Sequence, residues 1–194
     1  MKKIFFITVA FSLIGCEISE EEIRDTTFAD ISIVPSSIEI DTQISNDNSI
    51  GQIVLSGKTE DLEKLIQTLT DYSIKNIKLP VSAPFHCELM SNATKIMRDE
   101  INKIEFNEGH NILMSNVTAD TVKDISVIKD LLIRQIENRV RWRESVINMI
   151  NNGVKNFIEI GPGKVLSGLI KRINRQVNVK SINSEEDIKN LDIS

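Results

Sequence analysis

The pattern of hydrophobic and polar residues in the first part of the chain predicts short strands and two helices. The almost continuously apolar run Ile4–Ile14 is typical of a strand, because β-branched and aromatic residues dominate its start. Thr59 is predicted to cap a helix whose apolar residues fall at helical spacing. Strand, helix, strand, strand, helix, strand is the order of a ferredoxin-like unit. The six elements are Ile4–Ile14, Ile18–Arg24, Ile38–Ile44, Gln52–Ser56, Thr59–Thr70 and Ile74–Leu79.

Longer elements follow Pro80, and helices alternate there with strands. Ser45–Gly51, by contrast, is rich in Asn, Asp, Ser and Gly, which predicts a turn. The nearly continuous apolar run Val154–Ile160 is typical of a buried parallel strand. Helices are predicted over Glu88–Ile104, Val127–Ile136, Trp142–Met149 and Lys164–Arg175, and strands over Asn111–Val117, Val154–Ile160 and Val177–Ile182. We therefore expect an α/β protein with a ferredoxin-like subdomain over residues 1–80 and a second part over 81–194.

The first residues allow a second interpretation. Lys2 and Lys3 precede about twelve largely apolar residues, as in a secretory signal. Leu13–Cys16 resembles the lipidation box of bacterial lipoproteins, which would make this an envelope protein anchored through Cys16. The apolar run is too short to span a bilayer as a helix, so no membrane crossing is expected. The competing interpretation is the strand named above.

Composition and charge exclude several classes of function. The chain has 194 residues, of which 41% are hydrophobic, and a net charge of -5. This balance does not favour nucleic-acid binding, which needs a basic field. The two histidines and two cysteines are too few and too scattered to suggest a zinc site. We expect both thiols to be reduced, as in a cytoplasm.

His86 is the strongest candidate for chemistry. It lies in "LPVSAPFHCELM", where Pro80 and Pro84 stiffen the chain and Phe85 can pack beside the ring. A rigidly mounted imidazole suits general-base catalysis. The alternative is a histidine that is hydrogen-bonded within the core at the start of a helix. Cys87 is adjacent in sequence and is expected to pack as a small hydrophobic residue.

The chain offers no partner nucleophile for this base. The G-x-S-x-G pentapeptide of a nucleophile elbow is absent from the sequence. "GPGK", at Gly161–Lys164, lacks the remainder of a phosphate-binding loop and predicts a tight turn. The helix after it carries four basic residues that form either a solvated face or a docking surface for an acidic partner. They are Lys164, Lys171, Arg172 and Arg175. His110 is expected at the surface and Trp142 in the core.

Several motifs together resemble one family. "NDNSIGQIVLSG", "LPVSAPFHCELM", "LLIRQIENRVRW" and "FIEIGPGKVLSGLIKR" are similar, in this order, to the C-terminal half of malonyl-CoA:acyl-carrier-protein transacylases. The resemblance extends from about Asn46 to Arg175. It implies the C-terminal part of an α/β-hydrolase-like acyltransferase core with an inserted ferredoxin-like subdomain. "SLIGCEISEEEI" loosely resembles the first strand and helix of that subdomain, which favours a cytoplasmic protein over an exported one.

The resemblance also implies roles for individual residues. His86 matches the histidine that deprotonates the catalytic serine, and Gln135 matches the residue whose backbone carbonyl orients that imidazole. The implied reaction moves malonyl from coenzyme A to acyl carrier protein in fatty acid biosynthesis, with malonyl-CoA as substrate and no bound cofactor. Phe85 resembles the malonyl-preferring version of related acyltransferases. The basic helix is the expected surface for the carrier protein.

The sequence departs from the family in ways that change the expected activity. The G-Q-G-S-Q motif, the G-H-S-L-G elbow and the arginine that binds the malonyl carboxylate are not found, and Arg139 stands where proline is usual. Acting alone, the chain is therefore expected to be inactive. It is expected to serve either with a second polypeptide that supplies the serine or as a module that binds acyl carrier protein. Without the strands of the front half, Val154–Ile160 is expected to be an unpaired edge.

Overall fold

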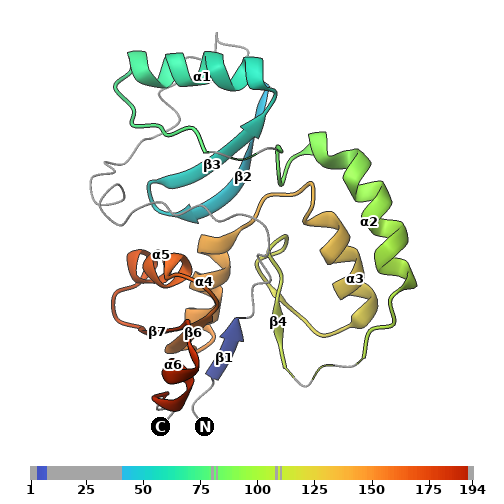
Figure 1. Cartoon of the computed structure of the whole chain (residues 1–194), viewed down its shortest axis with the longest axis vertical. Helices are drawn as coiled ribbons and strands as arrows, with labels where there is room; N and C mark the ends of the chain where they lie inside the picture. Colours follow the sequence, from blue (N-terminus) through green and yellow to red (C-terminus); the bar gives the residue numbers. More distant parts are fainter. Residues whose placement is uncertain are drawn as a thin grey trace. The chain divides into compact units, whose positions relative to one another are not determined.

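The computed structural model describes residues 4–7, 41–79, 81, 83–107, 109 and 111–191, with side chains from residue 41 onward (Figure 1). The described residues form two compact units. The first contains residues 4–7 and those from Val146 onward, and the second contains those from 41 to Ser145. The helix predicted at Ile18–Arg24, the first three residues of the strand predicted at Ile38–Ile44, and Cys16 lie outside the described residues, while the end of that strand, from Thr42, is confirmed as strand. This division does not test the predicted boundary at residue 80, which stays a prediction.

The first unit contains a parallel sheet of three strands. Its order is β1 (Ile4–Ile7), β6 (Asn156–Ile160) and β7 (Asn178–Ile182), with β6 in the centre. The strands predicted at Val154–Ile160 and Val177–Ile182 are confirmed, each slightly shorter at its start. The predicted unpaired edge is wrong, because β6 has a hydrogen-bonded neighbour on each side. Among the described residues, β1 pairs with β6 and not with the hairpin strands that lie within the predicted ferredoxin-like unit.

Helices and strands of the first unit both contribute apolar side chains to its core. The helix α4 (Trp142–Asn151) begins in the second unit and continues into the first, where α5 (Val165–Ile173) and the short α6 (Glu185–Lys189) follow. α6 was missed in the sequence, although Ser184 and Asp187 form a capping box at its start. The buried apolar residues of this unit are Val146, Met149, Val154, Phe157, Ile158, Leu169, Ile170, Val177 and Ile182.

The turn predicted at Gly161–Lys164 is confirmed as the connection between β6 and α5. Gly163 has a φ of 89°, which a residue with a side chain adopts only at a cost. Glu159, which is 9% exposed, then caps the helix from the preceding strand. Its carboxylate accepts hydrogen bonds from the backbone N–H groups of Leu166 (3.0 Å) and Ser167 (2.8 Å). An acidic group at this end also complements the helix dipole, so strand and helix are fixed to one another.

The second unit contains a hairpin of β2 (Thr42–Ser49) and β3 (Gln52–Gly57). The turn predicted over Ser45–Gly51 is wrong in extent, because β2 continues to Ser49 and only Ile50 and Gly51 turn. Register shifts interrupt the pairing between Ile44 and Asn46 and between Asp47 and Ser49. Such bulges accommodate extra residues in one strand of a pair. Polar turn-forming residues therefore lie in a strand, where they pair with β3 and where Ser45 and Asp47 also hydrogen-bond the backbone of the distant Val140.

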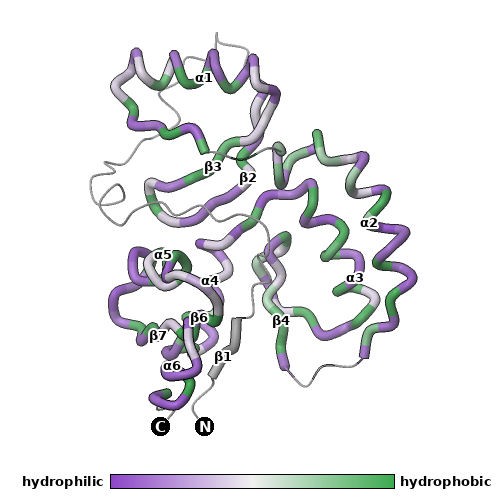
Figure 2. The backbone as a smooth tube through the Cα atoms, in the orientation of Figure 1, coloured by the Kyte–Doolittle hydropathy of each residue, from purple (hydrophilic) through white to green (hydrophobic). Residues whose placement is uncertain are grey.

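The helix α1 (Thr59–Asp71) confirms the predicted helix, and hydrophobic and hydrophilic residues alternate along it (Figure 2). Lys58, not Thr59, is its N-cap residue, and it makes no side-chain capping bond. The strand predicted at Ile74–Leu79 is wrong, because these residues are not in a strand and Ile77 is 54% exposed. Alternation alone does not make a strand without a neighbour to accept its hydrogen bonds.

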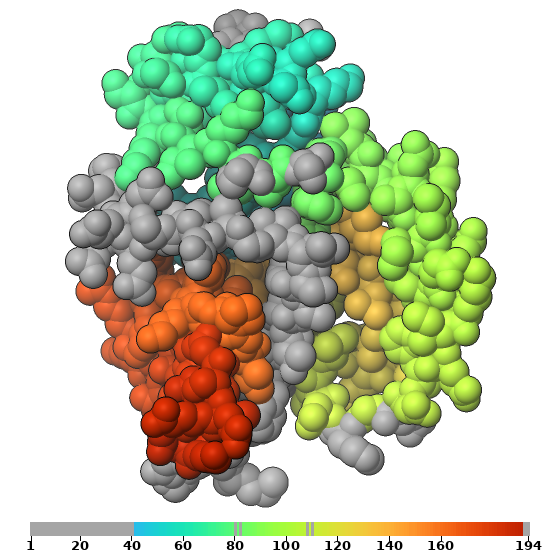
Figure 3. All heavy atoms as spheres, in the orientation of Figure 1, coloured from blue at the N-terminus to red at the C-terminus, as the bar shows by residue number. Residues whose placement is uncertain are grey.

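Two helices and a small hairpin complete the second unit. The helix predicted at Glu88–Ile104 is confirmed as a 3₁₀ turn, η2 (Glu88–Met90), followed by α2 (Ser91–Lys103). Much of α2 is exposed at the surface (Figure 3), and Ile96 is 66% exposed. α3 (Ile125–Arg134) confirms the helix predicted at Val127–Ile136. In place of the strand predicted at Asn111–Val117, a two-residue β4 (Leu113–Met114) pairs with β5 (Thr121–Val122).

Helices long and apolar enough to cross a membrane are not found among the described residues. The mixed α/β class is confirmed, and the ferredoxin-like arrangement stays a prediction. Trp142 is 5% exposed, as predicted for a core residue.

Replacing Phe157 with alanine is expected to lower the free energy of unfolding by about 3–5 kcal/mol, because a large aromatic ring would leave a cavity. Phe157 is 1% exposed in the central strand. Urea denaturation followed by circular dichroism measures the change. Val165→Ala is the matched control at a side chain that is 57% exposed, and it should change stability by less than about 0.5 kcal/mol. Equal losses in both variants would contradict this placement of the core.

Candidate functional site

The residue singled out in the sequence, His86, lies in a tight turn just before η2. Its φ is 60°, a left-handed conformation that is uncommon for a residue other than glycine. The backbone N–H of His86 donates to the carbonyl oxygen of Ile136 at 3.1 Å. Non-glycine residues in this conformation store backbone strain, which persists only where the surroundings hold them, and such residues cluster at functional sites.

The imidazole of His86 contacts the backbone of Gln135. The distance from Nδ1 to the carbonyl oxygen of Gln135 is 2.6 Å, although the two residues are 49 positions apart. This is the pair that the sequence predicted, and the structure places it together. A carbonyl oxygen only accepts hydrogen bonds, so the hydrogen sits on Nδ1 and Nε2 keeps its lone pair. A ring held in this tautomer can receive a proton on Nε2.

The carbonyl that receives this bond is held by the end of α3. Gln135 is the C-cap residue of that helix, and its side-chain oxygen accepts a hydrogen bond from the amide of Asn116 at 3.3 Å. The helix starts at Asp124, whose carboxylate accepts from the backbone N–H groups of Ser126 and Val127. Hydrogen bonds from Ser126 and Val127 lower the pKa of Asp124 below its usual value. The carboxylate is therefore a stable cap at neutral pH.

Neighbouring side chains tie the His86 turn to the β2–β3 hairpin. Ser56 donates its hydroxyl hydrogen to the carbonyl oxygen of Phe85 at 3.0 Å. The side-chain oxygen of Gln43 accepts from the backbone N–H of Glu88 at 3.0 Å. Cys87 is 1% exposed and donates to the carbonyl oxygen of Pro84, which confirms its predicted packing role.

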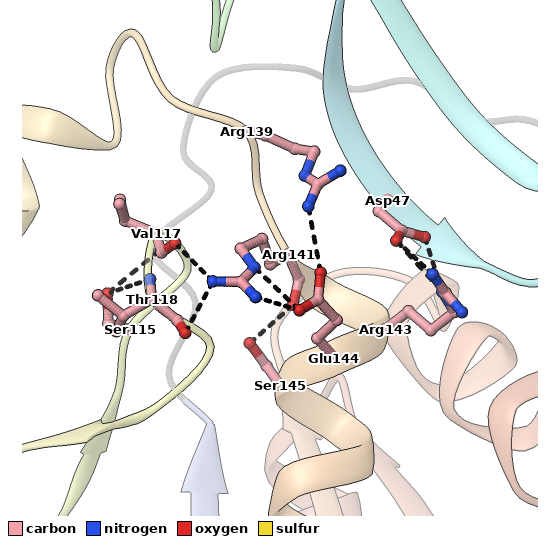
Figure 4. A network of polar contacts seen from close by, with 9 residues as sticks. All are labelled: Asp47, Ser115, Val117, Thr118, Arg139, Arg141, Arg143, Glu144 and Ser145. Carbon is pink, nitrogen blue, oxygen red and sulfur yellow. Dashed lines mark hydrogen bonds and ion pairs between the residues drawn. The ribbon is translucent and has the colours of Figure 1, made fainter.

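A network of arginines and carboxylates surrounds the start of α4 (Figure 4), and it was not predicted from the sequence. Glu144 accepts hydrogen bonds from Arg139 at 3.2 Å and from Arg141, and these contacts lower the pKa of Glu144, with the Arg141 bond as the main cause. Arg141 also donates to the carbonyl oxygens of Val117 and Thr118. Arg139 and Arg141 precede the helix and Arg143 lies in its first turn, and the Glu144 carboxylate offsets part of their charge.

Asp47 is the second acid of this network. Both of its oxygens accept from Arg143, at 2.8 to 3.2 Å, although 96 positions separate the residues in sequence. The Asp47 side chain is 9% exposed, so this two-point pairing compensates the burial of its charge. The alternating arginines in "RVRWR" were a signal in the sequence, but their partners could not be identified there.

The four basic residues of the last predicted helix lie in the first unit, on or beside α5. Lys171 donates to the backbone carbonyl oxygen of Val177 at 2.7 Å, which anchors its side chain. Lys164 and Arg175 flank the helix, and both are exposed. His110 lies outside the described residues, so its predicted surface position is not tested. Groups of three or more acidic, histidine or cysteine side chains able to hold a metal ion are not found in the described part of the chain.

Comparisons with known proteins identify the relatives of this chain. No family model matches it. It is 38% identical over 148 residues to the malonyl CoA-acyl carrier protein transacylase of Bacillus subtilis, covering 76% of this chain and 47% of the relative. A crystal structure of the Clostridium perfringens transacylase has a TM-score of 0.72 and 40% identity over 77% of this chain and 47% of that one. A malonyl-transacylase in complex with a type II polyketide acyl-carrier protein matches with a TM-score of 0.72 and 32% identity, over 76% of this chain and 48% of that one.

The match covers most of this chain but only part of each relative. The chain spans about half the length of the curated relatives it matches. The matched part of the relatives is their C-terminal portion. The position predicted by resemblance is thereby confirmed, while the roles of individual residues stay predictions.

Glu144→Gln is expected to lower the free energy of unfolding at pH 7 by about 0.5–1 kcal/mol, because the arginines lose their carboxylate. The folded-state pKa of Glu144 is lowered from 4.5, so this contribution is present above pH 4.5 and is lost as the pH falls through the lowered value. Urea denaturation followed by the fluorescence of Trp142, the one tryptophan, measures it. The difference between variant and wild type should shrink below pH 4.5, and a difference independent of pH would refute the assignment.

Proposed function

This chain is a relative of the C-terminal portion of malonyl-CoA:acyl-carrier-protein transacylases, and we propose that it supplies the proton-transferring part of that reaction in fatty acid biosynthesis. The 2.6 Å contact between His86 Nδ1 and the Gln135 carbonyl oxygen supports the proposal most directly. It leaves Nε2 as the basic atom of a rigidly held imidazole, which general-base catalysis requires.

The proposed reaction has two half-reactions that use His86 in opposite directions. In the first, Nε2 takes the hydrogen of a serine hydroxyl while the serine oxygen attacks the malonyl thioester carbon. The carbon–sulfur bond breaks, and the coenzyme A thiolate leaves with the proton from the imidazolium. In the second, Nε2 takes the proton of the carrier's thiol, the sulfur attacks the serine ester, and the serine oxygen recovers the proton. Throughout, the Gln135 carbonyl accepts from Nδ1 and stabilises the positive charge on the ring.

The serine in this scheme comes from outside the 194 residues, which contain no elbow pentapeptide. We infer that a polypeptide related to the unmatched part of the transacylases supplies it. Such a polypeptide would also supply the arginine for the malonyl carboxylate. Malonyl-CoA is the proposed substrate, and no bound cofactor is required. Phe85, beside the base, favours malonyl over bulkier acyl groups.

The same proposal assigns the two parts of the chain and its compartment. The hairpin β2–β3 and α1 are part of a ferredoxin-like subdomain, and the residues from 81 onward are part of the acyltransferase core. Fatty acid biosynthesis of this kind places the protein in the cytoplasm. The alternative function is a module that binds acyl carrier protein without catalysis. Lys164, Lys171, Arg172 and Arg175 favour it, because their positive charge suits an acidic partner.

Malonyl transfer is expected only when the chain is co-expressed with the N-terminal portion of the Bacillus subtilis relative, and not with the chain alone. In the co-expressed pair, His86→Ala should lower the rate of malonyl transfer by about 10²- to 10⁴-fold, because the base is lost. Transfer of radiolabelled malonyl from coenzyme A to holo carrier protein measures the rate. His110→Ala, which removes the other histidine, is the matched control and should retain the rate. Transfer by the chain alone, or equal rates in both variants, would contradict the proposal.

Neutralising the two basic residues that flank α5 should weaken binding of acyl carrier protein. We expect the variant Lys164→Gln/Arg175→Gln to bind several-fold more weakly at low salt, and the difference to narrow at high salt as screening increases. Fluorescence anisotropy of labelled carrier protein gives the dissociation constants. Lys58→Gln/Lys95→Gln, the same charge change at exposed residues of the second unit, is the control. An unchanged affinity in the first variant would leave the docking assignment without support.

A further inference from the structure

The peptide unit that joins Phe85 to His86 is held at both of its polar atoms. Its oxygen, on Phe85, accepts the hydrogen bond from Ser56 at 3.0 Å, and its N–H, on His86, donates to the carbonyl oxygen of Ile136 at 3.1 Å. Ser56 belongs to β3, whereas Ile136 follows α3. Two separate elements thus fix the orientation of one peptide plane, immediately before the residue with the left-handed backbone.

Ser56 is suited to this task by its burial. It is 9% exposed, so its hydroxyl is shielded from much of the competing water. A serine in a strand interior contributes little packing, and here its hydroxyl reaches 29 positions along the chain. If it were removed, the Phe85 oxygen would lose its partner and the strained turn would lose one of its restraints.

We propose that Ser56 is a positioning residue that acts through the Phe85 carbonyl to keep the His86 ring on the Gln135 carbonyl. The proposal rests on the proposed function of His86 as the base, because positioning matters only for a ring that moves protons. Ser56 does not touch the reacting atoms. Its effect is to hold the φ of His86 near 60°, from which Nδ1 reaches the Gln135 oxygen at 2.6 Å. Without it the ring is free to leave that oxygen, and the hydrogen is no longer confined to Nδ1.

The test reads the tautomer of His86 directly by NMR. The full chain is labelled with ¹⁵N in its histidines, and long-range proton–nitrogen spectra at a pH where the rings are neutral show which nitrogen carries the hydrogen. His110 is the second histidine in the chain and serves as an internal reference. In wild type, the Nδ1–H tautomer of His86 should predominate. In Ser56→Ala the ratio of Nδ1–H to Nε2–H should fall about fivefold, as expected for one lost hydrogen bond.

Matched variants separate positioning from a general loss of stability. Ser45→Ala removes a hydroxyl from the same hairpin that is 1% exposed and donates to the carbonyl oxygen of Val54 at 3.2 Å. It should destabilise the protein without changing the His86 tautomer. Ser56→Thr keeps the hydroxyl and should restore the wild-type signal. Ser56→Cys keeps the shape with a weaker donor, and should shift the tautomer in the same direction as alanine even if the alanine variant does not fold.

Each outcome decides the proposal. A shift in Ser56→Ala or Ser56→Cys that Ser45→Ala does not show supports it. An unchanged tautomer in both Ser56 variants, or an equal shift in Ser45→Ala, overturns it. The spectra need neither malonyl-CoA nor a serine partner. A failure of malonyl transfer would therefore contradict the proposed function without deciding whether Ser56 positions the ring.

Discussion

The hydrogen bond between His86 Nδ1 and the Gln135 carbonyl oxygen is the interaction on which the rest of the site depends. It decides which ring nitrogen is basic, and His86 makes it from a left-handed backbone. That conformation costs on the order of 1–3 kcal/mol, which the surroundings must offset. The described contacts do so from two directions, through the Ile136 carbonyl after α3 and through Ser56 of β3. Strain at this residue is therefore part of what orients the ring.

The network of arginines and carboxylates at the start of α4 connects several elements to the residue whose carbonyl contacts the imidazole. Arg143 joins that helix to β2 through Asp47, and Arg141 joins it to the carbonyls at Val117 and Thr118. Backbone bonds follow the same routes, because Asp47 N–H donates to the carbonyl of Val140 and Arg141 N–H to that of Asn116. Asn116 in turn bonds the side chain of Gln135. The network thus reaches the residue whose carbonyl holds the imidazole.

Elements that depend on contacts between neighbouring residues could be predicted from the sequence, and those that depend on contacts between distant residues could not. Helices such as α1 and α3 could be predicted, because the spacing of their own apolar residues determines their buried face. The turn predicted over Ser45–Gly51 was wrong in extent, because backbone pairing with β3 and with the distant Val140 places the residues up to Ser49 in a strand. The strand predicted at Ile74–Leu79 was wrong because alternation of apolar and polar residues does not by itself specify pairing with another strand. His86 and Gln135 could be predicted from long motifs, but Ser56 could not, because an isolated serine carries no signal in a single sequence.

The described hydrogen bonds at the His86 turn come from residues between Gln43 and Ile136, all within the second unit. The orientation of the proposed base is therefore set by contacts within this unit. This separation is physically reasonable, because aligning a ring to a carbonyl requires fixed neighbours, whereas a nucleophile needs only to be brought within reach of Nε2. In the acyl transfer proposed above, the same ring must serve a thioester first and a thiol second, so its alignment has to survive the exchange of one substrate for another. A base whose restraints all come from its own unit satisfies that requirement, since neither substrate has to contribute to holding it.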